Sequence, residues 1–172
     1  MPEFVMEGRD HAARAESDFV FGFIEAALFT SREPSRNMDE WFTDEAKEAR
    51  EGGYESSVPA DAGYLQIHPD SLAAIRAFCQ AWQEKHSGLL ARAYGREDYS
   101  EAQAGRDLWF TSQGHGVGFW DRKALQAEDL GKALTEAAGQ DEIDVWFGDH
   151  VTHGDAPFIH FALTDRYVEA AA

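Results

Sequence analysis

The sequence has almost no cysteine and no long apolar run, and each shortage excludes a class of protein. The single cysteine, Cys79, has no second cysteine to pair with, which excludes an internal disulfide and fits a reducing cytosol. No run of 18 apolar residues occurs, so we expect no membrane span. The first eight residues lack the basic start and the apolar stretch of a secretory signal, so we predict a cytoplasmic location.

Basic residues are also scarce: 15 stand against 32 acidic ones, for a net charge of -17. Residues 1–56 hold 14 acids and 6 bases and residues 107–172 hold 12 and 4, whereas 57–106 is nearly neutral. A field of this sign repels nucleic acid and anionic membranes and attracts basic protein surfaces. We therefore expect neither nucleic acid nor a membrane as a direct partner. Acidity that only keeps the protein soluble is the other interpretation, and composition leaves both open.

Length and composition favour one folded domain over residues 1–172. The chain is long enough to bury a core, and contents of 44% hydrophobic and 13% aromatic residues exclude a disordered chain. Within the domain we expect a flexible start over 1–16, an irregular acidic segment over 31–58 and a tail over 164–172.

Helical spacing dominates the first half of the chain. Ser17 and Asp18 supply an N-cap for a helix that continues to about Thr30. The longest predicted helix opens at Pro69 and places apolar residues three and four apart along one side: Leu72, Ile75, Cys79, Trp82, His86, Leu89 and Ala93. A position in this row makes Cys79 a core residue rather than a nucleophile.

Two shorter helical segments are also expected. Met38–Arg50 reads as a short acidic helix that Trp41 and Phe42 hold on one side while its carboxylates face water. Asp98 has an acidic residue, Glu101, three positions later, which is the spacing of a helix start.

The second half predicts a sheet. Residues 107–111 and 117–121 read as the paired strands of a hairpin, joined by the glycine-rich turn 112–116. A helix is expected over 124–138, with Gly139 as its stop. Strands over 143–148 and 157–163 complete a β-β-α-β-β order, and 64–67 reads as one more short strand. The predicted class is α+β, a helical N-terminal half packed on a mostly antiparallel β-β-α-β-β sheet.

Four stretches of the chain resemble a known family. They are Asp107-Leu-Trp-Phe-Thr, Gly114-His-Gly-Val-Gly-Phe-Trp-Asp-Arg122, Leu130-Gly-Lys-Ala-Leu-Thr-Glu-Ala-Ala138 and Val145-Trp-Phe-Gly-Asp149. Together they are similar to small acidic proteins encoded in bacteriophage and prophage genomes, a family without an established activity. The resemblance implies a phage-type origin and a small domain that acts in the host cytoplasm, and it carries over no catalytic residue. The chain departs from the family pattern at its end, where a further predicted strand follows.

Few residues suggest chemistry. The metal-like cluster consists of Asp149, His150, His153 and Asp155, whose imidazoles and carboxylates are zinc ligands by type. Their spacing matches no standard site, and acids and glycine are ordinary turn residues. No nucleophile elbow is present either. We therefore predict no cofactor and no catalytic residue.

The charge pattern and the resemblance together predict a binding protein. We expect a phage-type acidic inhibitor that binds a basic host protein, in particular a nucleic-acid-binding defence complex whose phosphate groove the carboxylates would occupy. The predicted partner-binding residues are Asp39, Glu40, Asp44, Glu45, Glu48, Asp141, Glu142 and Asp144. The alternatives are a metal protein or enzyme that uses His115, His150 and His153, and self-association as a homodimer.

Overall fold

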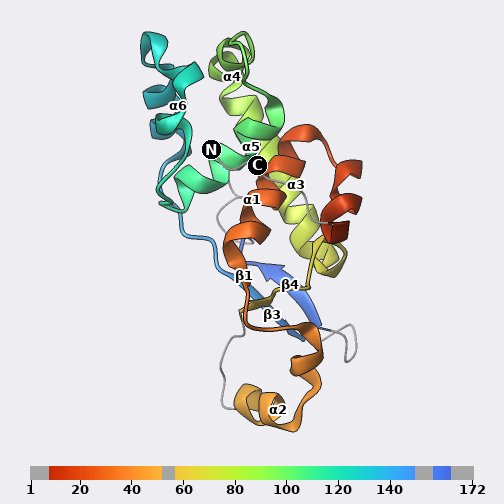
Figure 1. Cartoon of the computed structure of the whole chain (residues 1–172). Coiled ribbons are helices and arrows are strands. Elements are labelled where there is room, and N and C mark those ends of the chain that lie inside the picture. Colours follow the sequence, from red (N-terminus) through yellow and green to blue (C-terminus); the bar gives the residue numbers. More distant parts are fainter. Residues whose placement is uncertain (1–7, 52–56, 150–156, 164–172) are drawn as a thin grey trace.

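The fold is mostly helical, and the computed structural model describes residues 8–51, 57–149 and 157–163. Figure 1 shows α1, α3, α4, α5 and α6 gathered in the upper part, the strands below them, and α2 alone at the lower end. No helix within these residues is both long and apolar enough to cross a membrane. In chain order the elements are η1 (Gly8–Ala15), α1 (Asp18–Ser31), β1 (Arg32–Glu33), η2 (Met38–Phe42), α2 (Asp44–Glu51), β2 (Val58–Pro59), η3 (Tyr64–Gln66), α3 (Pro69–Lys85), α4 (Ser87–Tyr94), α5 (Glu101–Ser112), η4 (Phe119–Asp121), η5 (Lys123–Leu125), η6 (Ala127–Asp129), α6 (Leu130–Ala138), β3 (Val145–Asp149) and β4 (Pro157–Phe161).

Helices α1 and α5 form the centre of the core, and two glycines let them touch. A Cβ on Gly22 would lie 1.9 Å from the carbonyl oxygen of Ala102, and one on Gly105 would lie 2.0 Å from a carbonyl oxygen of α1. Near the other end of both helices, Trp109 Nε1 donates a hydrogen bond to Thr30 Oγ1 at 2.9 Å. The contacts proceed from the starts of both helices toward their ends. The two helices therefore run in the same direction, and their C-termini lie at the same end of the pair.

The predicted hairpin over 107–111 and 117–121 is wrong, because the first of these segments lies inside α5. Ser100 caps that helix, since its Oγ accepts a hydrogen bond from the Gln103 N–H at 3.1 Å. The second segment contains the 3₁₀ turn η4 instead of a strand.

The glycine-rich stretch ends α5 instead of turning a hairpin. Gly114 has a φ of 71°, which favours glycine. The His115 N–H donates to the carbonyl oxygen of Phe110 at 2.9 Å, and the Gly114 N–H donates to that of Thr111 at 3.2 Å. These bonds form a Schellman motif, and the edge-to-face contact of the Phe110 and His115 rings, 5.8 Å between centroids, supplies its usual side-chain contact.

Two motif residues, Asp107 and Arg122, belong to a buried polar cluster. Asp107 is fully buried, and its carboxylate accepts hydrogen bonds from Arg122 Nη2 at 2.6 Å, from Tyr99 Oη at 2.9 Å and from Gln103 Nε2 at 3.0 Å. Burial raises the pKa of the Asp107 carboxyl above its ordinary value, although Arg122 opposes this shift. The cluster ties η4 to α5, so the Asp-x-Trp-x-Thr and Gly-Phe-Trp-Asp-Arg motifs have a structural role.

The aromatic residues of the motifs divide between core and surface. Trp109, Phe110 and Phe119 are buried, and Phe119 stacks on Trp82 of α3 with centroids 5.8 Å apart. Trp120 is 51% exposed. Three of these four rings are therefore core residues.

The sheet is smaller than predicted. β3 and β4 pair in antiparallel fashion, with Val145 opposite Phe161 and Asp149 opposite Pro157. β1 and β2 form a separate parallel pair. The predicted single β-β-α-β-β sheet is not present among the described residues, although helices combined with small sheets remain compatible with an α+β class.

Local helix signals are mostly confirmed. Ser17 Oγ accepts from the Val20 N–H at 3.4 Å, Pro69 begins α3, and Gly139 ends α6 with a φ of 63°. The long predicted helix is divided at His86 into α3 and α4.

Three further predictions need correction. The predicted strand over 64–67 is the 3₁₀ turn η3 for its first three residues, α6 begins at Leu130 rather than at 124, and α5 starts at Glu101 behind Ser100 instead of Asp98. Residues 8–15 of the predicted flexible start form η1.

The segment predicted to be irregular, 31–58, contains the acidic helix that the sequence predicts. Met38–Arg50 corresponds to η2 followed by α2. Trp41 is buried as expected, whereas Phe42 is 55% exposed and does not hold the segment against the protein. The predicted tail over 164–172 lies outside the described residues.

Candidate protein-binding surface

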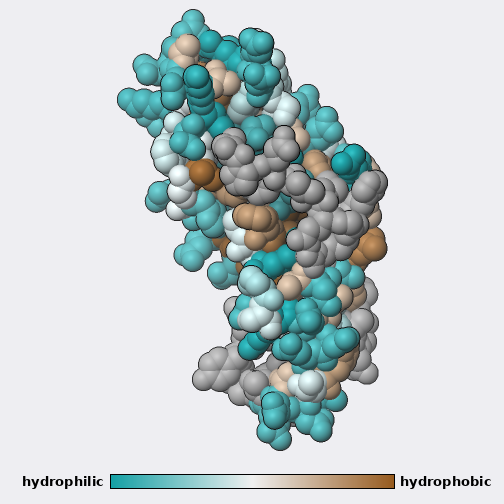
Figure 2. Space-filling model, in the orientation of Figure 1, coloured by the Kyte–Doolittle hydropathy of each residue, from teal (hydrophilic) through white to brown (hydrophobic). Residues whose placement is uncertain are grey.

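The candidate surface is an acidic excursion, by which we mean residues 38–51, the elements η2 and α2. In Figure 1 this excursion lies at the end of the molecule opposite α4 and α6, connected to the rest through the strands. Figure 2 shows the same end covered mainly by hydrophilic residues, while the most hydrophobic surface on this face lies around the middle of the molecule.

Two contacts fix the excursion to the rest of the protein, and a third is internal to it. The Trp41 ring packs edge-on against Phe147 of β3, with centroids 5.2 Å apart and an interplanar angle of 81°. The Met38 N–H donates a hydrogen bond to Asp61 Oδ1 at 2.7 Å. Within the excursion, Thr43 joins η2 to α2, because its Oγ1 donates to the Glu40 carbonyl at 2.8 Å and accepts from the Ala46 N–H at 3.2 Å. The first part of the excursion, η2, is therefore held against the rest of the protein.

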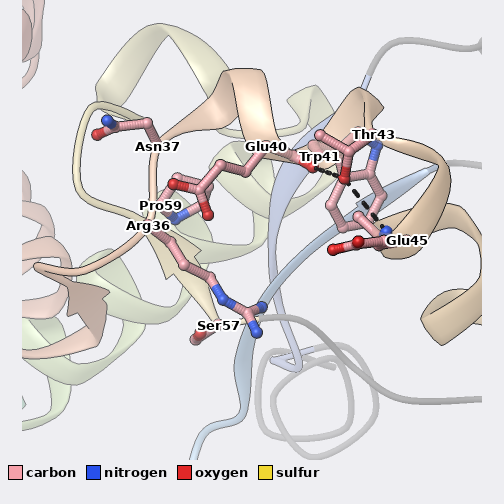
Figure 3. Close-up of a pocket in the computed structure, with 9 residues that line it drawn as sticks. Arg36, Asn37, Glu40, Trp41, Thr43, Glu45, Ser57 and Pro59 are labelled. Atoms are coloured by element: carbon pink, nitrogen blue, oxygen red, sulfur yellow. Dashed lines mark hydrogen bonds between the residues drawn. The ribbon is translucent and has the colours of Figure 1, made fainter.

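A hollow of about 460 Å³ lies between the excursion and β2 (Figure 3). Its lining residues are Arg36, Asn37, Glu40, Trp41, Thr43, Glu45, Ala46, Ser57 and Pro59. Arg36 forms an ion pair with Glu33 at 3.7 Å. The Ser57 hydroxyl donates a hydrogen bond to the same carboxylate, and this bond is the main cause that holds the pKa of Glu33 below its ordinary value. Two of the predicted acids, Glu40 and Glu45, thus border a cavity with both signs of charge.

The five predicted acids of the excursion are exposed and lack cationic partners. Asp39, Glu40, Asp44, Glu45 and Glu48 are all exposed. None of them belongs to an ion pair within the described ranges of the chain. Lys47 is the one base between positions 38 and 48, so this stretch carries a net charge of -4.

Four acids of the helical body, by contrast, form ion pairs with arginine. Glu25 pairs with Arg106 at 2.9 Å, Asp107 pairs with Arg122, Glu16 pairs with Arg76, and Glu128 pairs with Arg96 at 2.7 Å, together with a longer contact to Arg92. Five of the eleven arginines of the chain thus pair with acids of the helical body, whereas the five acids of the excursion have no ion pair within the described ranges.

The other predicted acids, Asp141, Glu142 and Asp144, lie in the segment between α6 and β3. Gln113 holds this segment in place, because its Nε2 donates to the Asp141 carbonyl at 2.8 Å and its Oε1 accepts from the Ile143 N–H at 2.9 Å. The Asp141 N–H donates in turn to the carbonyl of Ser112 at 3.0 Å.

This segment borders a second, polar hollow of about 580 Å³ at the C-termini of α1 and α5. It is lined by Thr30, Ser31, Trp109, Ser112, Gln113, Gly114, His115, Gln140, Asp141, Glu142 and Ile143, a set without lysine or arginine. Two helix C-termini, each with partial negative charge, add to the two carboxylates. The structure therefore brings His115 together with Asp141 and Glu142, and it places Glu40 and Glu45 of the excursion at a different hollow.

The predicted metal site lies mostly outside the described residues. Asp149 ends β3, and His150, His153 and Asp155 fall outside the described residues. Among described residues, no group of three or more histidine, cysteine, aspartate or glutamate side chains is arranged to hold a metal ion.

The only thiol does not suit nucleophilic chemistry. Cys79 is completely buried in α3, and burial raises the pKa of its thiol well above the usual range. This confirms the prediction of a core cysteine.

Sequence reasoning missed one residue of the surface. Phe42 is expected there to face the protein, because an aromatic next to Trp41 fits the apolar side of a helix. The 3₁₀ turn directs the two rings differently, so Trp41 is 8% exposed and Phe42 is 55% exposed.

The candidate surface offers exposed carboxylates, the exposed ring of Phe42 and two hollows, and the acids of the excursion have no described acid–base partner.

No protein-family model, no curated protein and no solved structure matched the chain.

Proposed function

We propose that this chain is a non-enzymatic binding protein whose acidic excursion docks on a basic surface of a nucleic-acid-binding protein. The observation that carries this proposal is the set of five exposed carboxylates on the excursion, which have no ion-pair partner in the described part of the chain. In the helical body, by contrast, Glu16, Glu25, Asp107 and Glu128 each pair with arginine.

The free protein bears a cost for this arrangement. Asp44 and Glu48 are four residues apart on α2, and Glu45 and Glu48 are three apart, so like charges are neighbours on the helix surface. Each such pair destabilises a helix by about 0.2–0.5 kcal/mol. The partial positive charge at the N-terminus of α2 stabilises Asp44 and Glu45, which lie in its first turn. Asp39, Glu40 and Glu48 lie outside that turn. A cationic partner surface would relieve the repulsion.

Carboxylates on a rigid turn resemble phosphates in charge and in hydrogen-bond acceptance. A protein that binds nucleic acid offers lysine and arginine placed to receive phosphates, and the excursion would compete for that groove. Opposite fields also accelerate association, and salt weakens them within a Debye length of about 8–10 Å. The resemblance of the sequence to phage-encoded proteins is the reason to seek this partner among host defence complexes.

The test is a capture experiment with two charge-matched variants. The excursion variant carries Asp39→Asn, Glu40→Gln, Asp44→Asn, Glu45→Gln and Glu48→Gln. The control variant neutralises five exposed acids of the helical body that have no ion pair in the described chain: Glu84, Glu97, Asp121, Asp129 and Glu136. Both variants change the net charge by the same amount, so only the position of the charge differs.

We expect the wild-type chain and the control variant to retain the same basic, nucleic-acid-binding protein from host lysate at low salt. The excursion variant is expected to retain about tenfold less, and high salt is expected to release the partner from all of them. Retention of no such protein by the wild-type chain at any salt would refute the proposal. Equal losses in both variants would show that only the total charge matters.

A further inference from the structure

Phe42 is the exposed aromatic residue at the acidic end of the molecule. Its side chain is 55% exposed, and it follows directly after Trp41, which is 8% exposed. Asp39 and Glu40 precede it within the same 3₁₀ turn, and Asp44 begins the helix that follows. The ring therefore stands within a frame of carboxylates.

The backbone of the turn that carries this ring is held in place. Trp41 is packed against Phe147, Met38 is hydrogen-bonded to Asp61, and Thr43 joins the turn to α2. A backbone fixed before binding loses little entropy when a partner binds, so the turn presents Phe42 from a pre-organised position.

Other exposed apolar residues lack this setting. Leu65, 71% exposed, lies on η3 next to Tyr64 and Gln66, and Trp120, 51% exposed, borders a separate hollow that includes Leu125 and Lys132. Phe29, 62% exposed, lies on α1, and Arg32 follows it by three residues. Phe42 differs from all three because acids lie within three residues of it on both sides.

We propose that Phe42 is the aromatic anchor of the interface, and that the partner is a protein that binds single-stranded nucleic acid. This inference rests on the proposed function. Proteins that bind single strands combine a cationic groove for the backbone with aromatic side chains on which bases stack. Carboxylates beside one protruding ring offer both features, charge in place of phosphate and a flat ring in place of a base.

The pattern fits other occupants less well. Proteins that follow the backbone of a duplex meet phosphates and receive no unstacked base, so they have no slot for the ring. A second copy of this chain would bring five carboxylates against five, which the net charge of -17 opposes. Charge complementarity thus favours a cationic, base-stacking surface.

The experiment uses the full chain immobilised at low salt, with the protein that it captures from host lysate identified and then purified. Phe42→Ala removes the ring, Phe42→Tyr retains it, and Leu65→Ala removes a more exposed apolar side chain elsewhere. Dissociation constants are measured over a range of salt concentrations, and bound partner is challenged with oligo(dT) or with a duplex of equal length.

We expect Phe42→Ala to weaken binding about 5- to 150-fold, the range found for loss of one base-stacking contact, with an unchanged salt dependence. Phe42→Tyr and Leu65→Ala should bind within about twofold of the wild type, and oligo(dT) should displace the partner better than the duplex does. Circular dichroism checks that each variant is folded.

The failures can be told apart. If the excursion acids matter but Phe42→Ala binds like the wild type, the anchor is refuted and the proposed function stands. If the duplex competes better than oligo(dT), the single-strand partner is refuted. If light scattering shows a dimer of the wild-type chain that Phe42→Ala abolishes, the ring serves self-association and the inference is overturned. If the wild type captures no basic partner, the proposed function itself fails.

Discussion

The buried ion pair between Asp107 and Arg122 gives the most quantitative prediction. The Asp107 side chain is 0% exposed and that of Arg122 is 6% exposed, and the guanidinium donates to Oδ1 from Nη2 at 2.6 Å and from Nε at 2.8 Å. The variant Arg122→Met retains much of the side-chain bulk and removes both donors. It leaves a buried carboxylate with neutral donors from Tyr99 and Gln103.

Removal of one partner from a buried pair costs about 3–5 kcal/mol, because the remaining charge stays in a poorly solvated site. For a domain of this size each kcal/mol lowers Tm by about 2–4 °C. We therefore expect Arg122→Met to lower Tm by about 6–20 °C at pH 7.5. Lys132→Met, which removes an exposed charge from α6, should change the free energy of unfolding by less than about 0.5 kcal/mol.

The pH dependence supplies the sharper test. Burial already raises the pKa of Asp107, and loss of Arg122 removes the charge that opposes this rise. A carboxyl with a raised pKa in the folded state contributes stability that is present below its unfolded pKa of about 3.9 and is lost as pH rises through the folded pKa. The deficit of Arg122→Met relative to the wild type should therefore shrink as pH falls from 7.5 toward 5.

Chemical denaturation followed by circular dichroism measures both quantities. The double variant Asp107→Asn with Arg122→Met has no buried charge, so it should be less destabilised than Arg122→Met alone. A loss below about 1 kcal/mol for Arg122→Met, or a deficit that does not change with pH, would refute this description of the cluster.

Three further predictions test the packing and the titration of other groups. Gly105→Ala places a Cβ 2.0 Å from a carbonyl oxygen of α1 and should lower the free energy of unfolding by more than about 3 kcal/mol. Gly88→Ala, which has open space around it in α4, should raise the free energy of unfolding by about 0.5–1 kcal/mol. Equal effects of the two substitutions in urea denaturation would contradict the close helix crossing. Hydrogen bonds from Arg76 lower the pKa of Glu16 from 4.5, so the contribution of Glu16 to stability is present above that value and is lost as pH falls further. Glu16→Gln should therefore reduce the fall in Tm at acidic pH. An unchanged fall in a pH series of melting curves would argue against the pair. The buried Cys79 thiol should react with a thiol reagent only after unfolding, and rapid labelling of the native protein at pH 8 would show that the site is open.

Sequence reasoning succeeded where the signal is local. Ser17, Pro69 and Gly139 act through their own backbone geometry or through a neighbour within one turn, so their roles can be predicted without knowledge of the tertiary structure. The β3–β4 hairpin follows for a similar reason, since its two strands are close in sequence.

The hairpin prediction over 107–121 failed because α5 is buried nearly all round. Every residue from Asp107 to Ser112 is buried, so the helix has no polar side from which its period can be recognised. A short aromatic run without a polar stripe is as compatible with a strand as with a helix. Only the contacts of Gly105 with α1 decide between them, and those contacts come from residues far apart in the sequence.

The candidate surface was predictable in part. An acidic segment with few bases is expected to be exposed, and the eight predicted acids are exposed or half-buried as the sequence indicates. Glu40 and Glu45 border one hollow, whereas Asp141 and Glu142 border another because Gln113 holds their segment by hydrogen bonds. The exposure of Phe42 depends on the packing of its neighbour Trp41 against Phe147. Neither relation has a local sequence signal.

The central claim is that the acids of the excursion, by their position, bind a basic partner. The most direct measurement is the dissociation constant of the purified partner for the excursion variant and for the charge-matched control variant, at one low salt concentration. The account predicts about tenfold weaker binding for the excursion variant and a wild-type constant for the control. Two equal constants would contradict it, because the position of the charge would then have no effect.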